Sequence, residues 1–199
     1  GGIRDINKLA QRYPKAEIYF HQDLDGVVSA LGMKNYLEKY GIDVINTHVI
    51  QYGDKEFSVK KPSASEDVMP VLVDFAHGKP IFKIHTDHHD SQAGVEDDTA
   101  TQFRGARSNV ETISQTISPS DIFTDEDIMM INTVDSADYA KHDIEPEQVM
   151  NLIRDFESGD QTYEKRWMLG LLTNKLLLAY KNKPGFLEHL VMNSSPSLM

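Results

Sequence analysis

Short β-prone apolar runs alternate with segments of helical spacing along the first part of the chain. The runs predict strands at residues 17–21, 44–50, 70–75 and 81–86. Apolar residues at helical spacing predict one helix before Pro14 and a second over about 27–40, which Gly41 ends. The run at 70–75 is apolar on both faces, as is typical of a central strand. This alternation predicts an α/β fold with a parallel sheet flanked by helices.

The second part of the chain is predicted to be mostly helical. Ser108 to Glu111 reads as a capping box for a helix over about 109–117. Thr124 precedes three acidic residues and predicts the start of a helix that leads towards Asp135. Polar segments at 53–67 and from 91 to about 107 predict loops, and further helices are expected over 147–156, 163–180 and 185–192. We therefore expect an α/β domain over 1–140 and a helical C-terminal extension over 141–199.

Composition narrows the functional classes. The 199 residues include 31 acids and 20 bases, which gives a formal charge of −11 and disfavours long polyanions as partners. The absence of cysteine excludes disulfides, thiolate nucleophiles and cysteine-based zinc sites. No apolar run approaches membrane-spanning length, so we expect no membrane partner and a cytoplasmic location.

Acidic and histidine side chains gather where the predicted strands end. His21, Asp23 and Asp25 follow the first strand, and because side chains alternate along a strand we expect them to point the same way. Like charges this close repel each other unless a positive group lies between them, and a divalent cation would serve. The carboxyl ends of parallel strands are also where open α/β sheets place their sites. Three further segments carry such residues: Asp74, the run Asp87 to Asp90, and Asp135 with Asp138.

The donor types limit the metal. Only carboxylate oxygens and imidazole nitrogens are available in these segments, which suits Mn²⁺, Mg²⁺ or Fe²⁺ better than a structural zinc ion. A carboxylate between two ions can bridge them. Two ions about 3.5–4 Å apart can hold the attacking and leaving oxygens of an in-line phosphoryl displacement.

Each segment also has a purely structural interpretation. Asp23 and Asp25 together fit a solvated turn that caps the next helix, and Asp74 fits an ordinary strand end. The run from Asp87 to Asp90 fits a polar turn. His85, outside these segments, is interpreted as a packing or surface residue rather than a ligand.

Taken together, the four segments resemble the four motifs of the DHH phosphoesterase superfamily. That group includes RecJ-type exonucleases, nanoRNases, cyclic-dinucleotide phosphodiesterases and family II inorganic pyrophosphatases. The likeness covers about residues 17–140. His21 to Gly26 resembles the first motif, and Asp74 after Val-Leu-Val resembles the second. Asp87 to His89 is the triplet that names the family, and Asp135 to Asp138 stands in the place of the fourth motif.

The resemblance implies a site for two metal ions, with manganese expected and magnesium as an alternative. It assigns Asp23 to one ion, Asp25 to the other and Asp74 to both. It also assigns His88 to the second ion, together with an aspartate of the fourth motif. For that aspartate, the Val-Asp-Ser-Ala pattern favours Asp135 over Asp138.

The remaining implied roles concern the substrate and the support of the ligands. His89 would contact the substrate phosphate, and Asp87 would accept the ring N–H of a histidine ligand. His21 is a further ligand candidate, because the pyrophosphatases carry a ligating histidine in this motif, although their spacing to the first aspartate is longer. Arg104 and Arg107 follow the triplet and are candidates for neutralising charge on the phosphoryl oxygens.

The function implied is metal-dependent hydrolysis of a phosphodiester at a nucleic acid end, in a short oligonucleotide or in a nucleotide. One alternative is a pyrophosphatase or small phosphomonoesterase with the same site, and another is a metal-binding scaffold without turnover. Many DHH enzymes carry a second domain with a glycine-rich GGGH-like segment that binds substrate, and this sequence has no such segment. We therefore expect either a minimal single-domain member or a chain that lacks its substrate domain.

Overall fold

The computed structural model describes residues 3, 5–21, 23–50, 67–75, 82–88, 100–103, 106–116, 125–135 and 191–192. The helices expected over 147–156 and 163–180 lie outside these residues. So does the C-terminal extension over 141–199, except for two helical residues, Val191 and Met192.

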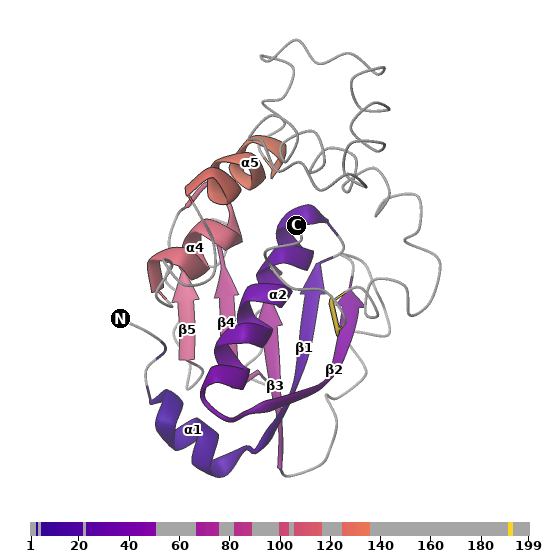
Figure 1. The fold of residues 1–199 in the computed structure, drawn as a ribbon, viewed down its shortest axis with the longest axis vertical. Coiled ribbons are helices and arrows are strands. Elements are labelled where there is room, and N and C mark those ends of the chain that lie inside the picture. The colour runs from indigo at the N-terminus through magenta and orange to yellow at the C-terminus, as the bar shows by residue number, and fades with distance from the viewer. Residues whose placement is uncertain are drawn as a thin grey trace, which may run out of the picture.

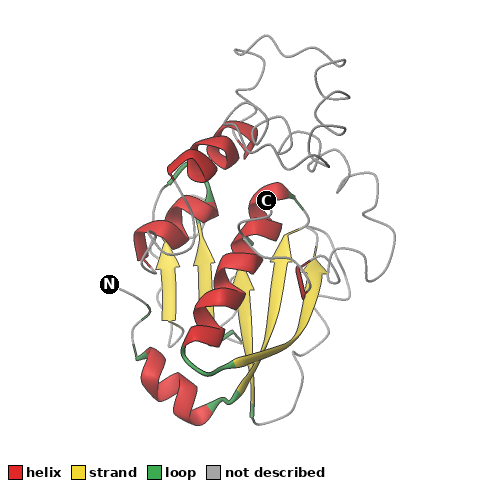
Figure 2. Cartoon of the chain, viewed as in Figure 1, coloured by secondary structure: helices red, strands yellow, loops and turns green. Residues whose placement is uncertain are grey.

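Five parallel strands form one sheet (Figures 1 and 2). Its strand order is β2-β1-β3-β4-β5, and each neighbouring pair runs in the same direction. The predicted α/β class with a parallel sheet is therefore confirmed, and the run predicted to be central, β3, occupies the middle of the sheet. The strands are β1 (Lys15–His21), β2 (Asp43–Ile50), β3 (Val68–Val73), β4 (Ile84–Asp87) and β5 (Ala100–Phe103).

Helices pack on the sheet. In Figure 1, α2 lies in front of the strands, and α4 and α5 lie near the upper ends of β4 and β5. The predicted start of one helix and the predicted end of another are confirmed, whereas α2 begins at Leu24, before the predicted residue 27. Ser108 Oγ accepts the Glu111 N–H at 3.1 Å at the start of α4, and Gly41, at φ 82°, follows α2. The helices are α1 (Ile6–Arg12), α2 (Leu24–Lys39), α4 (Asn109–Thr116) and α5 (Asp125–Asp135).

The core lies between the sheet and its helices. Ile18 and Phe20 of β1 are fully buried in the same cluster as Leu31 and other apolar residues of α2. The opposite face of the sheet carries a smaller cluster that includes Leu72 of β3. Because β3 contributes to both clusters, burial on its two faces explains its continuous apolar sequence.

One strand falls within a segment that was predicted to be a loop. β5 occupies residues 100–103 and pairs with β4 from Ile84↔Ala100 to Asp87↔Phe103. Its sequence, Ala-Thr-Gln-Phe, has neither an apolar run nor a strict alternation of apolar and polar residues, so the sequence pattern did not reveal it. The fourth strand also differs from the predicted range of 81–86, because β4 begins at Ile84 and continues through Asp87.

The strand order fixes where a site can form. The chain passes from β1 to β2 on one side of the sheet and from β3 through β4 to β5 on the other. The order therefore reverses between β1 and β3, and a crevice opens at the carboxyl ends of strands around such a reversal. His21 ends β1 and Asp74 directly follows β3, so both residues flank this point.

The turn from β1 into α2 requires a glycine. A Cβ at Gly26 would lie 1.9 Å from the carbonyl oxygen of His21, a backbone atom that cannot move aside without shifting the end of the strand. This close approach places the first turn of α2 directly against the end of β1. Asp23 and Asp25 are thereby held beside His21.

We expect Gly26→Ala to lower the free energy of unfolding by about 3 kcal/mol or more, because the added methyl group overlaps backbone. Gly41→Ala is the matched control. A Cβ there meets nothing within 4 Å, so only the positive φ is penalised, at about 1–2 kcal/mol. Urea unfolding of both variants measures the difference, and equal losses would contradict the close approach at Gly26.

Candidate metal centre

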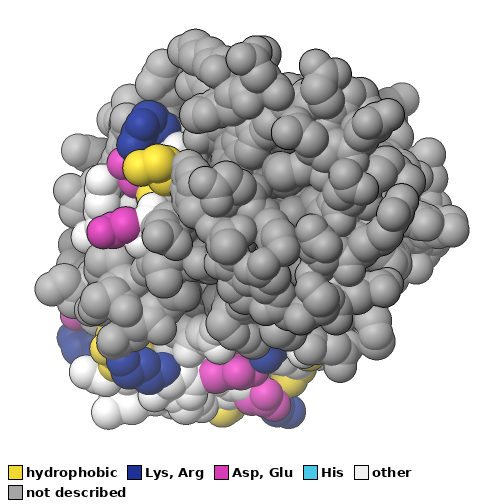
Figure 3. Space-filling model, turned by 45° about the horizontal axis from the view of Figure 1, so that its top comes forward, with side chains coloured by type: hydrophobic (Ala, Val, Ile, Leu, Met, Phe, Trp, Pro, Cys, Tyr) yellow, Lys and Arg dark blue, Asp and Glu magenta, His cyan; other side chains and the backbone are white. Residues whose placement is uncertain are grey.

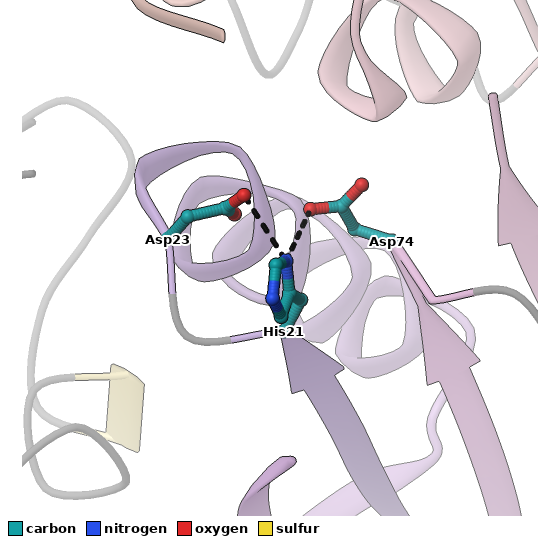
Figure 4. A group of neighbouring side chains, drawn as sticks. All are labelled: His21, Asp23 and Asp74. Carbon is teal, nitrogen blue, oxygen red and sulfur yellow. Dashed lines mark ion pairs between the residues drawn. The ribbon is translucent and has the colours of Figure 1, made fainter. Parts of the chain in front are cut away.

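Two side chains from the ends of neighbouring strands meet a third from the start of α2 (Figure 4). His21 Nδ1 lies 3.1 Å from Asp23 Oδ2 and 3.9 Å from Asp74 Oδ2. These three residues form a group whose ligand atoms could hold a metal ion. The group lies at the reversal of strand order between β1 and β3.

The prediction that His21, Asp23 and Asp25 point the same way because they alternate along one strand was wrong. β1 ends at His21, so the two aspartates do not alternate along a strand. Asp23 is instead the N-cap of α2, with Oδ1 accepting the Gly26 N–H at 2.7 Å, and Asp25 lies in the first helical turn. The capping interpretation of Asp23 therefore holds for Oδ1, while Oδ2 faces His21.

A second group surrounds His88, which directly follows β4. Its Nε2 lies 3.4 Å from Asp25 Oδ2, 3.5 Å from Asp74 Oδ1 and 3.6 Å from Asp135 Oδ2. These partners come from α2, from the turn after β3 and from the last residue of α5. Asp25, His88 and Asp135 form one possible metal-ligand group, and Asp74, Asp87 and His88 form another.

Asp74 is the residue that the group around His21 shares with the group around His88. Its Oδ1 faces His88 and its Oδ2 faces His21, and its side chain is only 1% exposed. Its backbone has φ 54°, in the left-handed region, where aspartate is tolerated better than most residues but still disfavoured. Such conformations concentrate at functional sites. Here the turn directs one carboxylate between two histidines.

Neighbouring groups fix this turn. The Asp74 N–H donates to the Thr86 carbonyl oxygen at 3.0 Å, and His85 Nε2 lies 2.7 Å from the Phe75 carbonyl oxygen. His85 is a packing residue, since its ring is buried and bonded to the backbone. The His85 ring therefore fixes the backbone of Phe75, the residue that follows Asp74.

The electrostatics of the acids differ with their partners. Burial raises the pKa of Asp74 well above its usual value of 3.8, and the charges of Asp25 and Asp23 raise it further. Burial and the Asp23 charge also raise the pKa of Asp25. Burial opposes ionisation of Asp23 as well, but its hydrogen bond to His21 and the charge of that ring outweigh this effect and lower its pKa.

The separations around His88 Nε2 are longer than direct hydrogen bonds and are compatible with ligands around an ion. Two donors about 2.1 Å from one ion lie about 3.0 Å apart at right angles and about 3.4 Å apart at tetrahedral angles. The three contacts of His88 Nε2, at 3.4–3.6 Å, lie close to the upper value. The donors are carboxylate oxygens and imidazole nitrogens, both of which can bind a divalent cation.

His88 is oriented by a backbone group that the sequence did not indicate. Its Nδ1 lies 3.2 Å from the Ala106 carbonyl oxygen, a contact that fixes an N–H at Nδ1 and directs Nε2 towards the three carboxylates. Asp87 had been expected to support a histidine in this way. For His88 the contact comes from Ala106, while buried Asp87 joins Asp74 and His88 in a possible ligand group.

Asp25 has a second set of partners that was also not predicted. Its Oδ2 accepts the Asn109 N–H at 2.9 Å and its Oδ1 accepts the Val110 N–H at 3.0 Å. The carboxylate therefore binds the N-terminus of α4, where free amides and the helix dipole favour a negative charge. Both the start of α2 and the start of α4 point at the acidic cluster.

Of the four remaining predicted site residues, the structure describes Arg107. Arg107 is exposed, with Nε 3.6 Å from Glu111 Oε2, and it lines a hollow of about 360 Å³ between α4 and α5. Its role as a phosphate clamp stays a prediction. His89, Arg104 and Asp138 lie outside the described residues.

The chain matches no protein-family model and no curated protein sequence. The resemblance to the DHH superfamily therefore rests on the four sequence motifs alone. None of the helices that the structure describes has the length and apolar character needed to cross a membrane.

The raised pKa of Asp74 has a measurable consequence for the metal-free protein. The folded state holds this proton more tightly than the unfolded chain, so the contribution of Asp74 to stability is present below pH 3.8 and is lost as the pH rises through its folded pKa. We expect Asp74→Asn, which keeps the shape and tolerates the positive φ, to be more stable than wild type at pH 7 by roughly 1–3 kcal/mol.

Urea unfolding in the presence of a chelator from pH 4 to pH 8 tests this expectation. The advantage of Asp74→Asn should shrink towards zero at the acid end. A variant that is less stable than wild type throughout would mean that the Asp74 carboxylate supports the fold rather than opposing it.

Proposed function

We propose that this chain is a two-metal phosphoesterase of the DHH type. Its reaction is the hydrolysis of a phosphodiester at a nucleic acid end, in a short oligonucleotide or in a nucleotide. The observation that carries the proposal is the position of Asp74. One buried carboxylate faces His21 with one oxygen and His88 with the other, as expected of a ligand shared by two ions.

The ligands divide into two sets around Asp74. His21 and Asp23 would hold one ion, and Asp25, His88 and Asp135 would hold the other. When bound, divalent ions would supply Lewis acidity to the phosphoryl group and lower the pKa of an attacking water. Manganese is the metal that the resemblance favours, with magnesium as the alternative.

The residues of the chain have their own tasks in this scheme. The amides at the start of α2 and α4 hold Asp23 and Asp25 in fixed orientations, so that these ligands need not reorganise during the reaction. Ala106 keeps Nε2 of His88 directed at the cluster. His89 would contact a substrate phosphoryl oxygen and neutralise the charge that develops there.

The charge of the protein favours short substrates. At −11 the chain repels a long polyanion, because few of its phosphates could be neutralised at once. In Figure 3, the coloured basic and acidic side chains lie near one another and form no continuous basic track among the described residues in this view. A substrate with few phosphates avoids this repulsion.

The position of His21 favours a second candidate, hydrolysis of pyrophosphate or a small phosphomonoester. His21 lies 3.1 Å from Asp23, so the first motif supplies a histidine beside its first aspartate, in a role like that of the pyrophosphatases. The products separate the two candidates. Pyrophosphate would yield free phosphate, and an oligonucleotide would yield mononucleotides.

The central experiment is manganese-dependent cleavage of short end-labelled DNA and RNA oligomers. We expect wild type to release mononucleotides and Asp74→Asn to lose on the order of 10²–10³-fold in turnover, because the substitution disturbs both ions at once. Asp43→Asn, an exposed aspartate at the start of β2, is the matched control and should cleave like wild type. An unchanged rate in Asp74→Asn would rule out the bridging role.

A further variant separates substrate contact from metal binding. We expect His89→Ala to retain the manganese content of wild type while turnover falls about 100-fold, because the lost group acts on the phosphoryl oxygens. Metal content is measured by atomic absorption after gel filtration, with His48→Ala on β2 as the control. Loss of manganese from His89→Ala would show instead that His89 is a metal ligand.

A further inference from the structure

A buried asparagine joins the elements that carry one half of the acidic cluster. Asn109 is 0% exposed and begins α4. Its Nδ2 donates to Ser29 Oγ at 3.0 Å and lies 3.1 Å from Thr86 Oγ1. Burying an amide side chain is unfavourable unless it is hydrogen-bonded, and here both bonds cross to other elements of the fold.

The two partners of Asn109 are closely linked to ligand candidates. Ser29 lies four residues after Asp25, so both are on one face of α2. Thr86 lies two residues before His88 at the end of β4. The Asn109 side chain thus connects α4 to the two segments that supply Asp25 and His88.

The backbone of Asn109 acts on the same half of the cluster. Its N–H binds Asp25 Oδ2 at 2.9 Å, and this oxygen is also the one that lies 3.4 Å from His88 Nε2. Asn109 therefore forms hydrogen bonds to α2 at two points, the Asp25 carboxylate and the Ser29 hydroxyl. α4 has only eight residues, and a helix this short is marginal on its own, so its start needs such anchors.

We propose that Asn109 is the positioning residue of the Asp25–His88–Asp135 half of the metal centre. Its amide bonds to Ser29 and Thr86 fix the start of α4, and the two amides there fix the rotation of the Asp25 carboxylate. Asn109 itself contacts neither ion nor substrate. This inference rests on the proposed two-metal function and extends it by making one ion depend on a residue outside the four motifs.

The test measures manganese binding rather than turnover alone. Titration calorimetry on wild type should give two Mn²⁺ sites. In Asn109→Ala we expect one of them to weaken by about 10–100-fold while the other is unchanged, as is typical when a residue that orients a ligand is removed. Turnover at low Mn²⁺ should fall accordingly and should recover when Mn²⁺ is raised, with KM for the oligonucleotide unchanged. Gln115→Ala, exposed on the same helix, is the control.

Two milder variants keep the test valid if Asn109→Ala does not fold. Ser29→Ala and Thr86→Val each remove one hydroxyl partner of Asn109, and each should weaken the same single Mn²⁺ site. Unchanged affinity at both sites in every folded variant, even with a lowered melting temperature, would overturn the positioning role. If wild type binds no Mn²⁺ and hydrolyses no phosphate ester, the proposed function fails first, and this inference fails with it.

Discussion

The organising constraint in this protein is the burial of several carboxylates around Asp74 without a matching set of cations among the described residues. His21 and His88 are the positively chargeable side chains that face Asp74, and each must also serve other aspartates. Burial, together with the charges of Asp25 and Asp23, raises the pKa of Asp74 well above its usual value. Asp74 also adopts a left-handed turn, a strained conformation of the kind that concentrates at functional sites.

The surrounding fold reduces the repulsion in a specific way. Asp23 is partly neutralised by the start of α2 and Asp25 by the start of α4, through backbone amides that bind one oxygen of the former and both of the latter. Asp74 receives no such donor for its side chain among the described residues. Asp74 therefore has less support for a negative charge than Asp23 or Asp25, and its carboxyl group lies between His21 and His88.

Part of this arrangement could be predicted from the sequence, and the rest depends on tertiary contacts. The Val-Leu-Val-Asp run predicts both the central strand and the edge at which Asp74 lies, because a strand that is buried on both faces has a continuous apolar sequence. His21, Asp23 and Asp25 were placed at the correct edge for a partly wrong reason, since a strand that ends at His21 cannot align the other two. The contact of Asp25 with Asn109 spans 84 positions, and no local pattern encodes it. The contact of His88 with the Ala106 carbonyl oxygen could not be predicted either, because every residue has a backbone carbonyl group.

The structural and the functional interpretations of these acids turn out to be compatible. A carboxylate has two oxygens, and in Asp23 one caps a helix while the other faces His21. In Asp25 both oxygens accept an N–H of α4, and Oδ2 also lies 3.4 Å from His88 Nε2. A carboxylate oxygen has two lone pairs, so Oδ2 keeps one for a second partner. The helix contacts hold each carboxylate rigid without using all of its acceptor capacity. Capping is thus the means by which the fold orients these side chains, and a structural role for Asp23 or Asp25 is no argument against a role in binding metal.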